Sequence, residues 1–474
     1  MAGLIARWRD LIATGWATLR GAESEAWRNL QSELAPGHQW RDRVVVLAFA
    51  AVTGLLVVGL AYLSDVGVHA FAQLSRATPL GTWIAFVWTP AVTVALVWWT
   101  RRFVPGAMGS GIPQVLRALD TEMPEQQRRW AVSLRVSLHK VGLVAGGMLA
   151  GLSIGREGPA VQVGAGVMLS TRRWLSSRST IDGHDLMVAG AAAGLAAAFN
   201  TPLGGIVFAL EQLSRRRGIN HSSLVIAAIV LAGLVSISVF GNISYFGQLR
   251  VQDLSSSLLV PGLVVALATG LAGGLFSRLI VASAQGLPDR FSGWRRQYPL
   301  RFAAGCGLAV AAIAVVTDGA TAGAGYAPTR AMLEARADVP PLFTLLKFCA
   351  TWLSTWSGVP AGLFAPSLAI GASIGHDIAQ LSSLSPEATL PLIALGMVGF
   401  LAAATQEPIT AFIIVMEMVA GHSMVLSLMA CAMVASGVSR LVARPLYGQL
   451  ALLLPVPPAT PPAPTSTPPN PPAA

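Results

Sequence analysis

Long apolar runs of about the length of a bilayer crossing are the feature that most constrains this chain. Segments 44–63, 224–241 and 263–284 are almost wholly apolar, and about 20 such residues span the hydrocarbon core of a membrane. Of the 474 residues, 54% are hydrophobic and 11% are charged, whereas a soluble domain carries about 25% charged residues. A water-soluble fold is therefore excluded, and we predict a polytopic helical protein whose surroundings are the lipid bilayer.

Other apolar segments are short and are broken by glycine and proline. Irregular backbone at membrane depth must be buried in protein or line a cavity. Segment 194–213 resembles segment 399–418, since each has three alanines, then a proline, then a glutamate nine residues later. Segment 155–164 pairs with segment 362–371 at nearly the same offset. We predict two structural repeats of interrupted helices, the pattern of secondary transporters, with the substrate site at their interface.

The predicted organisation has four parts. Residues 1–42 form a cytoplasmic N-terminal segment, in which 4–19 read as an amphipathic helix on the membrane surface. Residues 43–250 and 257–454 are the two membrane repeats, and the proline-rich residues 455–474 are a disordered tail with no regulatory domain after the membrane part.

The net charge of +10 is explained by loop arginines that follow the positive-inside rule, so no nucleic-acid partner is expected. We expect a multi-pass protein of a bacterial inner membrane with both termini in the cytoplasm.

Three glycine-initiated turns enter short helices at "GSGIP" (109–113), "GREGP" (155–159) and "GLFAP" (362–366). A helix N-terminus offers unpaired backbone N–H groups and a partial positive charge, and so it holds an anion readily. Three such starts directed at one point would form an anion site without a full positive charge. In that site, Ser110 adds a hydroxyl donor, and Glu157 is an anion of the protein itself that protonation would release.

No metal, cofactor or enzymatic activity is expected. The three cysteines lie in apolar segments without metal-ligand spacing. A distant alternative is an intramembrane serine hydrolase, because 151–155 and 371–375 fit G-x-S-x-G and His376 and His422 follow. That motif is short and the chain is rich in glycine, so chance matches are expected.

The three turns, in this order and with "PLY" at 445–447 near the end, resemble the CLC family of chloride channels and proton-coupled chloride transporters, in its prokaryotic form. The resemblance runs from about residue 43 to 454. It implies an all-α polytopic fold of two inverted repeats with tilted and discontinuous helices. It also implies a homodimer with a chloride pathway in each subunit.

The resemblance also assigns roles to particular residues. Serine at position 110 points to chloride, because nitrate-preferring relatives carry proline there, and fluoride is less expected because the fluoride branch lacks the serine pattern and the terminal tyrosine. The implied residues are Ser110, Tyr447 and the backbone amides of Leu363 and Phe364 at the central anion, Glu157 as the external gate, Arg156, Gly158 and Ala365 as helix-start backbone near the external site, and Lys140 as a source of positive potential.

One position departs from the proton-exchanging members. Where they commonly have an internal glutamate, this chain has Gln212, which cannot bind and release a proton near neutral pH. Glu211 is adjacent but points about 100° away on a helix. We therefore predict chloride transport with weak or absent proton coupling. The alternative is a strict proton/chloride exchanger with another internal proton path.

Structural alternatives stay open for the same residues. Glu157 could pair with Arg156 or cap its helix, and Ser110 could be a plain N-cap. Tyr447 could belong to an interfacial aromatic belt, and Lys140 to a buried ion pair. Glu211 and Glu417 are interpreted as structural charges rather than proton carriers.

Overall fold

The computed structural model consists mainly of helices in the part of the chain that it describes. That part comprises residues 37–76, 81–214, 218–219, 222–241, 258–334, 340, 342–419 and 421–457. The predicted surface helix at 4–19 and the tail beyond 457 lie outside it. The longer helices are α2 (Gly37–Arg76), α3 (Gly81–Phe103), α6 (Leu134–Leu149), α7 (Glu157–Leu169), α8 (Gly183–Phe199), α10 (Ser222–Phe240), α11 (Leu259–Gln285), α13 (Pro299–Val316), α15 (Phe343–Trp356), α16 (Phe364–Leu381), α17 (Pro386–Thr405), α18 (Pro408–Met418) and α19 (Val425–Val442).

Shorter helices lie between these. They are η1 (Pro105–Ala107), α4 (Ile112–Ala118), α5 (Glu125–Ala131), η2 (Ser170–Arg173), α9 (Pro202–Phe208), η3 (Ala209–Leu213), α12 (Arg290–Gln297), α14 (Tyr326–Leu333), η5 (His422–Met424) and α20 (Leu446–Leu452).

Seven of the described helices are long and apolar enough to cross a membrane. In α17, 89% of the most apolar window is buried inside the protein, whereas the other six bury between 28% and 39%. The six therefore leave apolar surface for lipid while α17 is enclosed by its neighbours. The predicted all-α polytopic fold is confirmed.

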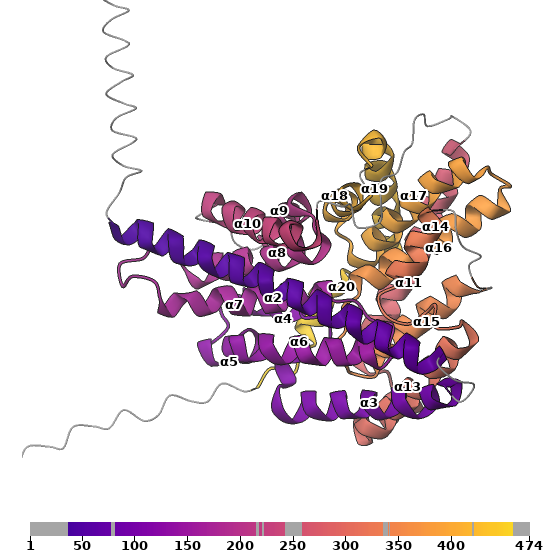
Figure 1. The fold of residues 1–474 in the computed structure, drawn as a ribbon, viewed down its shortest axis with the longest axis horizontal. Helices are drawn as coiled ribbons and strands as arrows, with labels where there is room; N and C mark the ends of the chain where they lie inside the picture. Colours follow the sequence, from indigo (N-terminus) through magenta and orange to yellow (C-terminus); the bar gives the residue numbers. More distant parts are fainter. Residues whose placement is uncertain are drawn as a thin grey trace, which may run out of the picture.

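The two halves of the sequence lie side by side and repeat one arrangement of helices. In Figure 1 the indigo and magenta first half lies to the left of the orange and yellow second half, and α2 crosses in front. Helix α7 packs on α8 in the first half, as α16 packs on α17 in the second. Each pair is followed by a break in the left-handed conformation, at Asn200 (φ 60°) and Gln406 (φ 61°). The predicted repeats are thus visible as matched helices and matched breaks.

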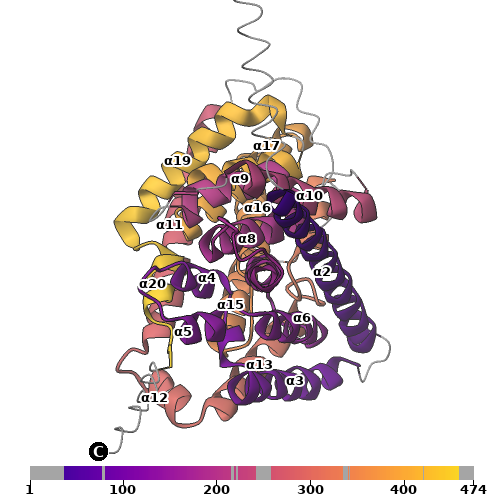
Figure 2. The same ribbon diagram turned by 90° about the vertical axis from the view of Figure 1, so that its left-hand side faces the viewer.

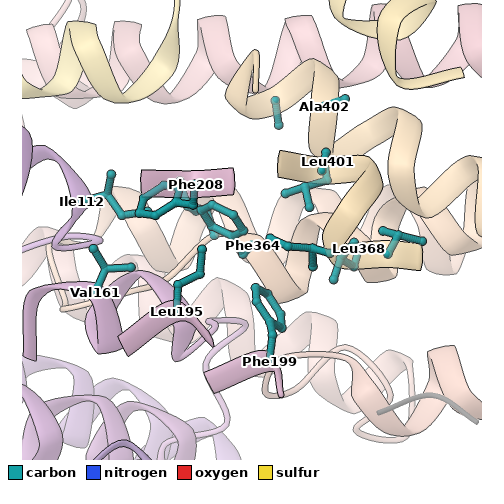
Figure 3. Packing of buried hydrophobic residues seen from close by; sticks show 14 of the residues in the cluster. Ile112, Val161, Leu195, Phe199, Phe208, Phe364, Leu368, Leu401 and Ala402 are labelled. Atoms are coloured by element: carbon teal, nitrogen blue, oxygen red, sulfur yellow. The ribbon is translucent and has the colours of Figure 1, made fainter. Parts of the chain in front are cut away.

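The last helix of the described residues links the two halves by its packing. Helix α20 lies at the end of the second repeat but packs against α4 of the first, as Figure 2 shows. The core beneath this crossing is apolar and aromatic: Phe364 at the start of α16 packs near Phe199 and Phe208, with ring centroids 6.0 and 6.5 Å away (Figure 3). First-half and second-half side chains therefore share one core.

Candidate anion site

The three predicted glycine turns meet at one place, here called the glycine junction (Gly109, Gly155, Ala361 and Gly362). Gly155 N donates to Gly362 O at 2.8 Å, and Gly362 N donates to Gly155 O at 3.0 Å. Ala361 N donates to Gly109 O at 3.1 Å. A Cβ at Gly362 would lie 2.7 Å from the Gly155 carbonyl oxygen, so only glycine permits this approach. Helices α4, α7 and α16 therefore begin around a single hydrogen-bonded junction.

The starts of these helices leave backbone donors available. The N-cap residues Gly111, Arg156 and Leu363 make no side-chain capping hydrogen bond. The first N–H groups of a helix have no partner within it. The junction therefore presents backbone N–H groups from both repeats.

The carboxylate of Glu157 lies between two of these helix starts. Glu157 is fully buried. Its Oε2 accepts hydrogen bonds from Arg156 N at 3.1 Å and from Ala365 N at 3.3 Å. The guanidinium of Arg156 instead pairs with Asp65 at 2.7 Å. The carboxylate thus occupies a position where backbone amides of α16 and of the turn before α7 hold a negative charge.

Ser110 of the first repeat and Tyr447 of the second repeat lie close to each other. Both are buried, with exposed fractions of 5% and 0%, and their hydroxyls lie close together. Among the described residues, neither hydroxyl makes a hydrogen bond of standard geometry. The ring of Tyr447 stacks on that of Phe364 at 6.0 Å. Because buried hydroxyls are normally satisfied, this pair fits a ligand that accepts hydrogen bonds.

A cavity of about 420 Å³ reaches Ser110 and Leu363. Its lining also includes the exposed side chains of Arg101 and Arg296 and the half-buried Arg295. A cleft lined by one sign of charge concentrates the opposite ion. The cavity therefore favours entry of anions toward the Ser110 end of the junction.

Lys140 supports the turn that carries Ser110. It is fully buried, and its Nζ donates to Ala107 O at 2.7 Å and to Gly109 O at 2.6 Å. No ion pair to Lys140 occurs within the described ranges. The structure thus shows Lys140 holding the loop before α4 by hydrogen bonds to carbonyl groups.

The acidic residues at the paired positions cap helices across the repeat interface. Glu211 accepts hydrogen bonds from Ile409 N at 3.2 Å and Thr410 N at 2.7 Å, at the start of α18. Glu417 accepts from Leu203 N at 3.2 Å and Gly204 N at 2.7 Å, at the start of α9. These contacts agree with the interpretation of Glu211 and Glu417 as structural charges rather than proton carriers.

Gln212, the residue at the altered internal position, is buried with 8% of its surface exposed. It lies in η3, which continues α9. An uncharged amide therefore occupies this buried position.

Sequence reasoning missed Tyr326, the first residue of α14. Its hydroxyl donates to Glu157 Oε1, and its ring lies under the guanidinium of Arg156 at 5.2 Å. The local sequence "GAGYAP" contains no motif that indicates this contact. A signal was available at longer range. Lys347 follows Lys140 by 207 residues, and this spacing points to a glycine-rich loop in the second repeat that matches the loop of Ser110.

The serines of the two G-x-S-x-G matches lie in structural contacts. Ser153 Oγ pairs with Thr351 Oγ1 at 2.8 Å, and Ser373 Oγ donates to Ile370 O at 2.9 Å. Neither serine is hydrogen-bonded to a histidine among the described residues.

One group of described side chains could hold a metal: Asp182, His184 and Asp185 at the start of α8.

Comparison with known proteins agrees with this geometry. The family model described as "Voltage gated chloride channel" matches residues 91–440. The H(+)/Cl(-) exchange transporter ClcA of Salmonella paratyphi A is 28% identical over 431 residues, which cover 86% of this chain and 89% of that protein. ClcA of Salmonella typhimurium is also 28% identical, with the same coverage.

Solved structures show the same fold. A slow cyanobacterial Cl⁻/H⁺ antiporter superposes with a TM-score of 0.73 and 24% identity, over 87% of this chain and 97% of that one. A CLC-type fluoride/proton antiporter superposes with a TM-score of 0.69 and 22% identity, over 86% and 97% of the two chains. Because the family model matches residues 91–440, which is more than half of this chain, this multi-pass membrane protein belongs to the CLC family of voltage gated chloride channels.

Proposed function

We propose that this protein transports chloride through a separate pathway in each subunit of a homodimer, and that Glu157 gates the pathway. The observation that carries the proposal is the position of the Glu157 carboxylate, which accepts hydrogen bonds from the turn before α7 and from Ala365 of α16. Backbone amides that hold a carboxylate also suit a small anion. The hydroxyls of Ser110 and Tyr447, which make no hydrogen bond of standard geometry with another described residue, supply donors for a second anion further along.

The gate follows from competition for one position. An ionised Glu157 accepts hydrogen bonds from the amides and blocks the pathway. A protonated carboxyl carries no charge for these donors to stabilise, so it leaves and chloride replaces it. Partial charges from peptide groups bind an ion weakly enough for it to leave again, as conduction requires. Lowering the pH therefore increases transport.

The membrane setting belongs to the same proposal. We place both termini in the cytoplasm and the protein in a bacterial inner membrane, which matches the arginines ahead of the first span. The arginine-lined cavity then faces the cytoplasm and Glu157 the outside. Chloride is the transported ligand, and no cofactor is required.

Proton coupling is proposed to be weak or absent, because Gln212 cannot carry a proton. One observation supports the alternative of strict exchange. Glu407, the residue before α18, is 1% exposed, and its carboxyl lies within electrostatic range of the phenol of Tyr447. A buried carboxyl beside the central site is a second acid that could accept a proton in place of the missing glutamate. Exchange through Glu407 is therefore the second candidate.

The test is chloride efflux from liposomes that contain the purified protein. Wild-type protein should dissipate a chloride gradient faster at low pH than at high pH. Glu157→Gln and Glu157→Ala should keep chloride efflux and lose its pH dependence, because neither side chain ionises.

Glu125→Gln is the matched control, since Glu125 pairs with Arg128 and Arg129 at the surface and should leave the pH response intact. A wild-type pH response in both Glu157 variants would refute the gate. The reversal potential under an imposed proton gradient then separates the two modes: no shift indicates a passive pathway, and a fixed shift indicates exchange.

A further inference from the structure

Each repeat carries a lysine that fixes a glycine-rich loop. Lys140 Nζ binds the carbonyls of Ala107 and Gly109. Lys347, which is 207 residues later and also fully buried, binds Thr321 O and Gly323 O, each at 2.8 Å. The two lysines lie in α6 and α15, at matching places in the two repeats. The second repeat thus has its own counterpart of the loop that presents Ser110.

The loop of the second repeat ends at Tyr326. Gly323 (φ 64°) and Gly325 (φ 90°) are in the left-handed region. A Cβ at Gly325 would lie 2.6 Å from the Cβ of Ala369 and 3.1 Å from Lys347 Cε. The chain there is held close to α16 and to the lysine. Tyr326 therefore starts α14 from a fixed position.

The ring of Tyr326 is held as well as its backbone. The guanidinium of Arg156 lies 5.2 Å from the ring centroid. The same guanidinium donates to Ala61 O at 2.8 Å and to Asp65 Oδ1 at 2.7 Å, both on α2. A cation over an aromatic face stabilises the arrangement. The phenol is thus directed at one acceptor, the Oε1 atom of Glu157.

Among the described residues, the charged and titratable groups around Glu157 come from three other elements. Tyr326 of α14 donates to it directly. Asp65 of α2 acts through Arg156, and Tyr447 of α20 lies within electrostatic range on the inner side. Helix α16 contributes the Ala365 amide rather than a charge. Of these groups, Tyr326 is the side chain that binds the carboxylate itself.

We propose that Tyr326 is a positioning residue for the gate, holding the ionised carboxylate of Glu157 in the closed position. This inference rests on the proposed function of Glu157. The matching loops of the two repeats then each place a hydroxyl near one end of the pathway, Ser110 on the cavity side and Tyr326 on the gate side. The phenol sets the pH at which the gate opens, because it stabilises the charged form and loses this contact when Glu157 leaves.

The test is Tyr326→Phe, which keeps the ring beneath Arg156 and removes only the hydroxyl. Without this donor the ionised carboxylate is less stable, so protonation occurs more readily. Transport should reach half of its maximum at a pH higher than in wild type by about 1 to 2 units, the effect of one hydrogen bond to a charged group. The maximal rate at low pH should be unchanged. Tyr298→Phe is the matched control, because Tyr298 also lies beneath an arginine, with Arg301 at 4.9 Å, but is exposed on the surface.

A second comparison separates positioning from general structural support. In a Glu157→Gln background, Tyr326→Phe should change neither the rate nor its pH dependence, because no ionised carboxylate remains to be held. A pH profile of Tyr326→Phe that overlays wild type, or an equal effect with and without Glu157, would overturn the inference. If Glu157→Gln itself retains the wild-type pH response, the proposed gate fails, which is a different outcome.

Discussion

The reciprocal capping by Glu211 and Glu417 leads to a quantitative prediction about stability. Each carboxylate accepts one short hydrogen bond of 2.7 Å and one longer bond of 3.2 Å from backbone N–H groups. Glutamine in the same place keeps one oxygen acceptor and brings an NH₂ group that cannot accept from an N–H donor. Each substitution Glu→Gln therefore removes at least one charge-assisted hydrogen bond.

The magnitude follows from the geometry. A hydrogen bond to a charged group contributes about 1.5–3 kcal/mol, and the lost charge at a helix N-terminus adds about 0.3–1 kcal/mol. Because both glutamates are half-buried, solvent screening reduces these values. We expect each single variant to lose roughly 1–3 kcal/mol of unfolding free energy.

Thermal unfolding in detergent, followed by tryptophan fluorescence, measures the loss. Glu211→Gln and Glu417→Gln should both lower the midpoint, and both should leave the reversal potential of chloride transport unchanged. Glu334→Gln serves as the control, because Glu334 pairs with Arg330 on the surface. An unchanged midpoint together with an altered proton response in either variant would refute the reasoning and make that glutamate a proton carrier.

Two further predictions concern selectivity and coupling. Ser110→Pro removes a hydroxyl donor near the central site and should raise nitrate flux relative to chloride; equal relative fluxes in wild type and variant would remove Ser110 from the selectivity site. Glu407→Gln should abolish any shift of the reversal potential with the proton gradient if Glu407 carries the proton, and a wild-type shift in this variant would exclude that role. Both are measured in the same liposomes as Glu157→Gln.

The fold could be predicted from the sequence because membrane constraints and internal repetition are both visible in it. An offset of 206 residues between Pro202 and Pro408 predicts matched helices, and matched helices are observed. The convergence of the glycine turns follows from the same repetition, since Gly155 and Gly362 are equivalent positions that face each other.

Individual side-chain contacts could not be predicted in the same way. Tyr326 reaches Glu157 from 169 residues away along the chain, and nothing in its neighbourhood distinguishes it from an ordinary buried aromatic. The sequence indicates a role for Lys140 through its charge, but its effect on the Ser110 turn depends on which carbonyls surround it. Such details depend on three-dimensional packing, which cannot be read from the local sequence around one residue.

The backbone pairing of Gly155 with Gly362 has a consequence for biogenesis. The two segments of this contact are made far apart in time on the ribosome, so a nascent chain that has inserted only its first half exposes the buried Glu157 turn without its partner. The pathway therefore cannot be assembled stepwise as the helices emerge. It forms late, after α16 and then α20 with Tyr447 have been made and the two halves close on each other, and arrested chains that stop before Phe364 should be recognised as unfinished by membrane quality control.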